Sequence, residues 1–207
     1  MFSQVYQDYT WRHHTDELVL YLTFDDGPIP DISDWVTEQL ALFNAKGTFF
    51  WIGENVRKHA KLAHQILDEG HLVGNHTETH KNGWKTETKT YLKDFLQGQQ
   101  TIAEYTGFQT KLFRPPYAKV RKSQARQILK SHEIVMMDIV AGDFDTTLEG
   151  AYCAEQVIKH AKPGSIVVFH DSVKAWDRLK VALPIVLKHF SEKGYKFRKL
   201  PEPEFYY

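Results

Sequence analysis

Short apolar runs alternate with amphipathic stretches along most of the chain. The first apolar run, ELVLYLTF at residues 17–24, is rich in aliphatic and β-branched residues and ends at two aspartates, which predicts a buried strand. Apolar residues at helical spacing over 31–47 predict a following helix that closes at a glycine. The alternation continues, and it predicts further strands at 48–53, 71–76, 112–117, 134–140, 165–171 and 195–200 and further helices at 54–69, 87–106, 122–132, 151–161 and 176–193.

Strands that are buried on both faces and separated by helices imply a parallel sheet with right-handed crossovers. About seven such units favour a closed barrel over an open sheet. A complete eight-unit barrel needs roughly 250 residues, so we expect 207 residues to form a barrel that lacks a unit or is irregular. The length suits a single domain over 1–207, with its core at about 18–195.

Charge and composition narrow the possible partners. Lys plus Arg and Asp plus Glu balance at 26 each, which argues against nucleic acid and anionic membranes as partners. We find neither an apolar run of about 18 residues, the length of a membrane span, nor a signal-peptide pattern. The localisation stays open, because a chain trimmed of its export signal would look like a cytoplasmic one. Cys153 is the single cysteine, and we expect it to be inert within a helix.

Polar residues that could carry chemistry follow the predicted strands. The carboxyl ends of parallel barrel strands share one face, and that face carries the active site. Separate stretches after five predicted strands should therefore contribute to one site: Asp25 and Asp26, His76, Arg114, Asp138 and Asp143, and His170 and Asp171.

The sequence HTETH and the aspartate doublet together indicate a metal site. His76 and His80 are four residues apart, a spacing that is weak evidence alone and departs from the zinc-protease motif because Thr77 follows the first histidine. Two imidazoles and one carboxylate form a three-ligand site for Zn²⁺ or a similar divalent ion. The second carboxylate would then stay free to take a proton from water. The spacing leaves open which aspartate, Asp25 or Asp26, has which role.

Five motifs occur in the order typical of one enzyme family: TFDDGP at 23–28, HTETH at 76–80, RPPY at 114–117, GDF at 142–144 and VFH at 168–170. In these motifs the chain resembles the polysaccharide deacetylases, carbohydrate esterase family 4, with a NodB-like domain. The resemblance covers residues 18–195, and it implies an α/β fold, a distorted (β/α)7 barrel of parallel strands with outer helices. It also implies a hydrolase that removes acetyl groups from a carbohydrate.

The resemblance also implies roles for single residues. Asp26, His76 and His80 look like the metal ligands, for Zn²⁺ first and for Co²⁺ or another divalent ion as alternatives. Asp25 looks like the general base, and Arg114 resembles the arginine that orients it.

Three further residues complete the implied machinery. The backbone N–H of Tyr117 is similar in position to the family's oxyanion donor. His170 looks like the general acid that protonates the leaving nitrogen, and Asp143 looks like the carboxylate that pairs with it. We expect Asp143 to raise the pKa of His170 through its charge.

The chain departs from the family pattern at three positions. Phe144 stands where the family usually has tryptophan, Val140 replaces an aspartate, and Val168 replaces a leucine. These changes leave the metal and base residues intact and alter the acetyl pocket. Aromatic faces suit pyranose rings, so Trp84, Tyr117, Phe144 and Trp176 are candidates for a sugar-stacking groove.

We therefore expect a monomeric, metal-dependent hydrolase that removes N-acetyl groups from N-acetylglucosamine units of peptidoglycan or a chitin-like polymer. Two alternatives keep the same site, namely an O-acetyl esterase of the acetylxylan type and a hydrolase of a small cyclic amide. The third is an inactive sugar-binding module, against which the complete set of site residues argues.

Overall fold

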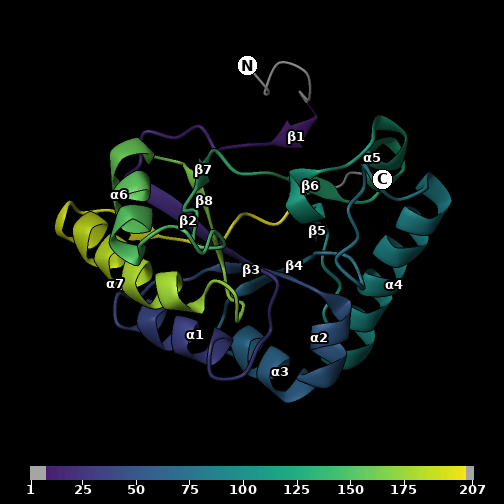
Figure 1. Cartoon of the computed structure of the whole chain (residues 1–207), viewed down its shortest axis with the longest axis horizontal. Helices are drawn as coiled ribbons and strands as arrows, with labels where there is room; N and C mark the ends of the chain where they lie inside the picture. Colours follow the sequence, from purple (N-terminus) through teal and green to yellow (C-terminus); the bar gives the residue numbers. More distant parts are fainter. Residues whose placement is uncertain (1–7, 204–207) are drawn as a thin grey trace.

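The computed structural model describes residues 8–203, which form one curled sheet of parallel strands surrounded by helices (Figure 1). The hydrogen-bonded order is β1-β6-β5-β4-β3-β2-β8-β7, and β9 pairs with the start of β2. The strands are β1 (Tyr9–Thr10), β2 (Val19–Asp25), β3 (Thr48–Trp51), β4 (Leu72–Asn75), β5 (Leu112–Phe113), β6 (Glu133–Val135), β7 (Ile139–Val140), β8 (Ile166–His170) and β9 (Lys196–Phe197). The helices are α1 (Ser33–Ala41), α2 (Gly53–Lys58), α3 (Ala60–Asp68), α4 (Thr88–Thr106), the 3-10 turn η1 (Pro116–Ala118), α5 (Lys122–Ile128), α6 (Gly150–His160) and α7 (Trp176–Glu192).

The core lies between the central strands and the helices that cover them. Phe24 of β2 lies between two aromatic rings from the neighbouring strands, with its centroid 5.0 Å from Phe49 and 6.1 Å from Phe169. All three side chains are fully buried. A continuous apolar strand is what burial on both faces requires, and the parallel register of β2 with β3 and β8 holds the ends of these strands together.

The predicted α/β fold, a distorted barrel of parallel strands with outer helices, is confirmed as a curled sheet. The sheet does not close, because β6, next to the terminal strand β1, and β7, the strand at the other end, do not pair with each other among the described strands. The N-terminal segment crosses the gap instead: Thr10 accepts from the N–H of Met136 (2.7 Å), and His13 donates to the carbonyl of Gly164 (3.0 Å). Figure 1 shows β1 at the top, above β6.

Two predicted elements are each divided in two. The expected helix at 54–69 is interrupted at His59, whose ψ of 39° lies outside the helical range, so α2 and α3 have separate axes. The expected strand at 134–140 becomes β6 and β7, at opposite ends of the sheet. Here the guanidinium of Arg114 donates hydrogen bonds to the carbonyls of Val135 and Met136, so these carbonyls do not continue the ladder.

The prediction that Asp138 belongs to the site face is wrong. Its carboxylate accepts hydrogen bonds from the Ser165 hydroxyl (2.8 Å) and the Ile166 backbone N–H (2.7 Å), at the start of β8. His170 lies at the other end of that strand. The reason is the divided strand: β7 begins only after Asp138, so this residue precedes a strand and does not follow one.

No helix within residues 8–203 is long and apolar enough to cross a bilayer. Residues 1–7 and 204–207 of the predicted single domain lie outside the described part, and the domain assignment and the monomeric state stay predictions.

The buried His71 predicts a loss of stability in acid. Its Nδ1 accepts the N–H of Gly47 (3.0 Å), and burial, with help from the charge of Lys46, lowers its pKa from 6.5 to about 4. The unfolded chain takes up a proton below pH 6.5 and the folded chain does not. We expect the contribution of His71 to the free energy of unfolding to be greatest above pH 6.5 and to fall by up to about 3 kcal/mol towards pH 4.

Chemical denaturation across this pH range tests the prediction, with His71→Asn as the matched variant. The asparagine Oδ1 can accept the same N–H and does not titrate, so the variant should lose less stability in acid. An identical pH dependence in both proteins would assign the effect to other groups.

Candidate active site

The two aspartates of the DDGP stretch lie where β2 ends. Side chains of consecutive strand residues point to opposite faces, yet Asp25 Oδ2 and Asp26 Oδ1 each lie 3.9 Å from the same atom, His76 Nε2. The backbone explains this, because Asp26 has a φ of 87° in the left-handed region that side-chain-bearing residues seldom adopt. Such strain is concentrated at functional sites, and it brings both carboxylates to one side of the strand end.

The loop from His76 to His80 follows β4 and is fastened to α4. The backbone N–H and the hydroxyl of Thr79 donate to the carboxylate of Asp94 at 3.1 and 2.7 Å. The N–H of Glu78 donates to the Asp94 carbonyl at 3.1 Å. These bonds fix the backbone between the two imidazoles, and His80 itself has a positive φ of 56°.

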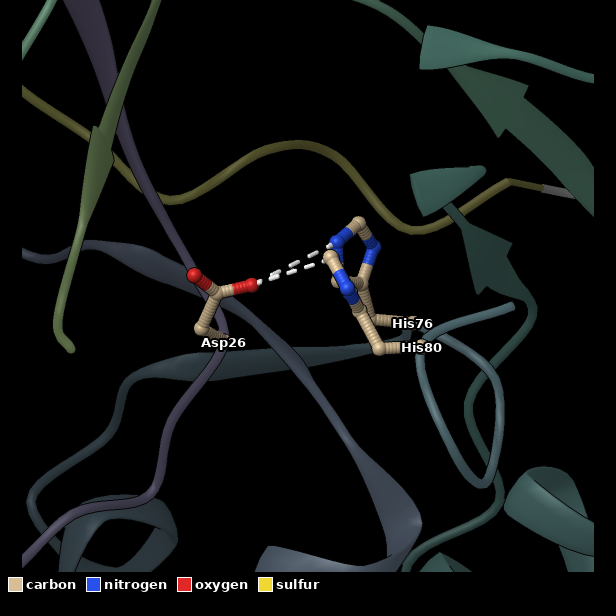
Figure 2. Close-up of side chains that lie close together, drawn as sticks. All are labelled: Asp26, His76 and His80. Atoms are coloured by element: carbon tan, nitrogen blue, oxygen red, sulfur yellow. Dashed lines mark ion pairs between the residues drawn. The ribbon is translucent and has the colours of Figure 1, made fainter. Parts of the chain in front are cut away.

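Asp26, His76 and His80 converge on one point, as Figure 2 shows. Asp26 Oδ1 lies 3.3 Å from His80 Nε2, and one atom from each of the three side chains lies within 4.8 Å of the others. Asp26 Oδ1 is buried and has no hydrogen-bond partner among the described residues. A buried carboxylate oxygen without a partner is costly, so this donor set fits a cation.

The protonation of His76 also suits a ligand. Its Nδ1 lies 2.7 Å from the carbonyl oxygen of Arg114, so Nδ1 carries the proton and Nε2 keeps its lone pair. Burial lowers the pKa of His76 to about 4, even though the nearby carboxylate of Asp25 acts in the opposite direction. The neutral imidazole is the form that binds metals.

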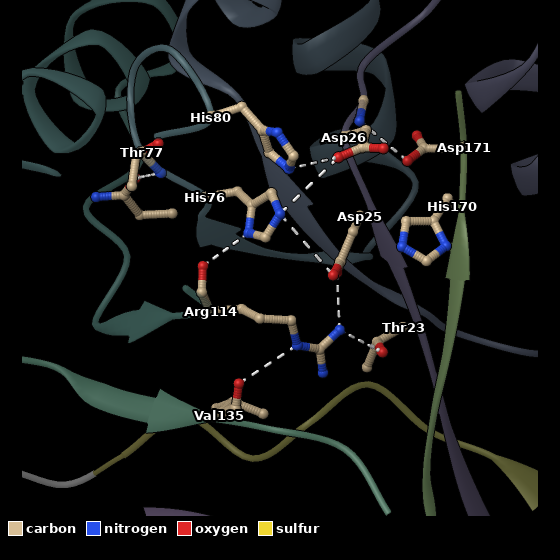
Figure 3. A network of polar contacts seen from close by, with 12 residues as sticks. Thr23, Asp25, Asp26, His76, Thr77, His80, Arg114, Val135, His170 and Asp171 are labelled. Carbon is tan, nitrogen blue, oxygen red and sulfur yellow. Dashed lines mark hydrogen bonds and ion pairs between the residues drawn. The ribbon is translucent and has the colours of Figure 1, made fainter. Parts of the chain in front are cut away.

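Asp25 is held by a buried guanidinium. Arg114 Nη1 donates to Asp25 Oδ1 at 2.8 Å and to the Thr23 hydroxyl at 2.7 Å, and Arg114 is fully buried (Figure 3). Burial alone would raise the pKa of Asp25, but the charge and hydrogen bond of Arg114, together with the charge of His170, lower it. Asp25 is therefore an ionised carboxylate beside the metal triad.

A second charged pair lies across the site. Both oxygens of the buried Asp143 contact His170: one accepts from its backbone N–H (2.7 Å) and the other lies 2.8 Å from Nδ1. Burial would lower the pKa of His170, but the hydrogen bond and charge of Asp143, followed by the charge of Asp25, raise it to about 9. His170 is therefore an imidazolium at neutral pH, with its proton available for transfer.

The metal triad and both charge pairs meet at one cavity of about 500 Å³. The residues that line it include Asp25, Asp26, His76, His80, Tyr117 and His170. Tyr117 has a φ of 60°, and its ring centroid lies 4.6 Å from that of His80. Of the four aromatic candidates, Tyr117 and Phe144 line the cavity, whereas Trp84 and Trp176 do not. Trp176 packs edge-on against Trp35 instead, at 5.0 Å.

The structure thus brings together all eight predicted site residues, and Asp138 is the exception among the wider candidates. The sequence placed Asp171 on the site face without giving it a role, and the structure shows it fully buried. Its carboxylate accepts from the N–H of Gly27 (3.1 Å) and from the hydroxyl of Ser33 (2.5 Å), and so holds the turn after the aspartate doublet. The sequence signal for this role was the position of Asp171 directly after His170 at a strand end.

Residues 12–137 match the family model for polysaccharide deacetylase. The chain belongs to the polysaccharide deacetylase family. Over 195 residues it is 29% identical to a peptidoglycan-N-acetylglucosamine deacetylase of Bacillus cereus, and the alignment covers 93% of this chain and 91% of that protein. It is 31% identical over 181 residues to the peptidoglycan-N-acetylglucosamine deacetylase PgdA of Listeria monocytogenes, covering 87% of this chain but 38% of that protein.

Solved structures of family members share the fold. The Bc1960 peptidoglycan N-acetylglucosamine deacetylase superposes with a TM-score of 0.89 at 26% identity, covering 97% of this chain and 95% of that chain. A family 4 acetyl xylan esterase from Clostridium thermocellum, in complex with a cobalt ion, superposes with a TM-score of 0.79 at 25% identity, covering 86% of each chain. The predicted family and its hydrolase class, polysaccharide deacetylases that cleave amide bonds, are confirmed.

The packing of α4 against the histidine loop predicts the effect of one methyl group. A Cβ on Gly98 would lie 2.7 Å from the carbonyl carbon of Thr77, closer than packed atoms approach. Ala is favoured over Gly within helices by about 1 kcal/mol, yet we expect Gly98→Ala to lower both thermal stability and Zn²⁺ affinity, because the loop must move.

Calorimetric Zn²⁺ titration and thermal unfolding measure the two effects, with the exposed neighbour Gln97→Ala as the control. The control should match the wild type in both. Undiminished Zn²⁺ affinity in Gly98→Ala would show that the loop tolerates the displacement.

Proposed function

We propose that this chain is a metal-dependent deacetylase that removes N-acetyl groups from N-acetylglucosamine residues of peptidoglycan. The observation that carries the proposal is that the Asp26–His76–His80 triad lies in one cavity with members of two charge pairs, Asp25–Arg114 and His170–Asp143. In one pair the carboxylate, Asp25, faces the cavity, and in the other the imidazole, His170, does so. The names of the Bacillus and Listeria relatives support the choice of substrate.

The triad residues would hold a divalent ion, with Zn²⁺ as the first candidate. Two neutral imidazoles and one carboxylate are a ligand set that Zn²⁺ accepts, and a catalytic site keeps a position open. When bound, such an ion lowers the pKa of a water from 15.7 towards about 7 and polarises a carbonyl. The cobalt ion in the acetyl xylan esterase structure supports Co²⁺ as an alternative.

The side chains would carry the proton transfers. Asp25, kept ionised by Arg114, accepts a proton from the attacking water. The backbone N–H of Tyr117 donates to the oxyanion, an interaction typically worth about 3–4 kcal/mol. His170, kept protonated by Asp143, gives a proton to the leaving nitrogen as the carbon–nitrogen bond breaks. The products are acetate and a free amine, and no nucleophilic serine or cysteine is needed.

The His170–Asp143 pair favours an amide over an ester. An amine leaves poorly without a proton, whereas an alcohol leaves more easily, so an imidazolium that is protonated at neutral pH is of greater use to an amidase. The likeness to an acetyl xylan esterase keeps O-acetyl esters as the second candidate substrate. Relative rates on acetylated xylan and on chito-oligomers separate the two, and the amide should be preferred.

Acetate release tests the proposed activity directly. We expect the purified protein to release acetate from peptidoglycan fragments and from acetylated chito-oligomers. A chelator should abolish the release, and Zn²⁺ or Co²⁺ should restore it. Binding of these sugars by metal-loaded protein without any acetate release would instead identify an inactive sugar-binding module.

Substitutions distinguish the general base from the metal ligands. We expect Asp25→Asn to retain Zn²⁺ and to lose activity by at least 100-fold, since general base catalysis contributes typically 10²–10⁴-fold. His76→Ala should lose the metal itself, because only two ligands remain. Metal content by atomic emission, measured beside acetate release, tests both. If Asp25→Asn empties the site, Asp25 is a ligand and the assignment within the doublet is reversed.

A further inference from the structure

The basic residues are unevenly distributed along the chain. Residues 81–130 contain eleven of the 26 Lys and Arg residues but only three of the 26 Asp and Glu residues. One quarter of the chain therefore carries an excess of eight positive charges, although the chain as a whole has none. This segment includes α4, α5 and the connections beside them, which lie together on the right of Figure 1.

Contacts between the two connections bring the basic residues into one strip. Arg121 Nη2 donates to the Trp84 carbonyl at 2.6 Å, and the hydroxyls of Thr88 and Ser123 lie 3.0 Å apart at the starts of α4 and α5. Lysines flank these contact points. We define the basic strip as Lys85, Lys89, Lys93, Lys119, Arg121 and Lys122.

The acidic residues nearby are committed elsewhere. Glu87 accepts the N–H of Thr90 (3.0 Å) and so caps α4. Asp94 holds the histidine loop and pairs with Lys81 at 3.7 Å. Across residues 8–203, the side chains of the basic strip form no ion pair within 4.0 Å. Like charges four residues apart, such as Lys89 and Lys93, destabilise a helix. The carboxylate of Glu87 lies beside them and its charge interacts with Lys89, yet the strip keeps an excess of positive charge that an anion would neutralise.

The strip runs from the catalytic cavity to a surface groove. Lys119 lines the cavity, and its Nζ lies 5.4 Å from the centre of the Trp84 ring, which is about half exposed. At the far end, Lys89 and Lys93 line a groove of about 740 Å³ between α4 and α5. The groove also contains Leu96, which is 61% exposed, and several glutamines. A bound polymer could therefore contact both places at once.

We infer that the basic strip binds the carboxylates of a peptide-bearing glycan strand and holds that polymer across the catalytic cavity. The inference rests on the proposed function and specifies the substrate further, as an anionic polymer and not a neutral one. Peptidoglycan supplies this chemistry, because its peptide substituents carry free carboxylates at intervals along the glycan. A row of cations complements such a repeating charge, and it also raises the rate of encounter.

The test compares two triple variants of equal charge. Lys89→Gln/Lys93→Gln/Lys122→Gln removes half of the strip, and Lys61→Gln/Lys159→Gln/Lys193→Gln removes three exposed lysines elsewhere. All proteins are loaded with Zn²⁺ and carry Asp25→Asn, which prevents turnover. Binding to purified insoluble peptidoglycan is measured by sedimentation at 50 and 200 mM NaCl. A second peptidoglycan sample has its carboxylates blocked as neutral amides.

We expect the strip variant to bind peptidoglycan roughly tenfold more weakly at low salt, since three exposed ion pairs of about twofold each are lost. The control variant should bind like its parent. Higher salt and blocked carboxylates should each weaken the parent's binding to the level of the strip variant. Without Asp25→Asn, both triple variants should deacetylate a short, neutral chito-oligomer at the wild-type rate.

If both triple variants bound peptidoglycan equally weakly, the effect would come from the net charge of the protein and not from the strip, and the inference would be overturned. Undiminished binding to the blocked peptidoglycan would also overturn it, and so would a strip-dependent affinity for a DNA homopolymer that exceeds the affinity for peptidoglycan. These results are independent of the proposed function, which fails instead if metal-loaded wild-type protein releases no acetate from either substrate.

Discussion

Two consecutive carboxylates that face one imidazole are the constraint on which this structure depends. A regular strand would turn Asp25 and Asp26 to opposite faces. The left-handed backbone at Asp26 brings them to the same side, 3.9 Å each from His76 Nε2. Adjacent negative charges repel, and the protein resolves this by giving each a different partner. Arg114 neutralises Asp25, and Asp26 is left with a buried oxygen that has no hydrogen-bond partner among the described residues and suits a cation.

Arg114 ties the site to the fold. Its guanidinium donates to Asp25 and Thr23 on β2, and also to the carbonyls that follow β6. Its own carbonyl oxygen sets the proton on His76. The side chain also lies over the Phe50 ring, 4.1 Å from its centre. A buried ion pair with so many additional hydrogen bonds offsets its desolvation cost, and no lysine could reproduce this planar set of donors. The same residue thus sets the charge of the base and the end of a strand.

Much of this could be predicted from the sequence. The order of strands and helices and the eight site residues followed from hydrophobic periodicity, from polar residues at strand ends and from a family resemblance. The incorrect or incomplete predictions share a cause: groups far away in sequence changed the local hydrogen bonding. The 134–140 segment has the pattern of one strand. However, the Arg114 guanidinium donates to two of its carbonyls, and one of its N–H groups donates to the Thr10 carbonyl. Asp138 consequently lies at the start of a strand, and Asp171 acts through Ser33, far away in sequence.

The short N-terminal crossing has a consequence for self-association. Tyr9 and Thr10 pair with β6 and so cover an edge that the curled sheet would otherwise leave open. Arg12 and His13 fasten the segment to the residues that precede β8. Uncovered edges present free N–H and C=O groups to strands of other molecules. A chain shortened past His13 would keep every catalytic side chain, yet it would expose the unpaired backbone of β6 and gain a tendency to aggregate.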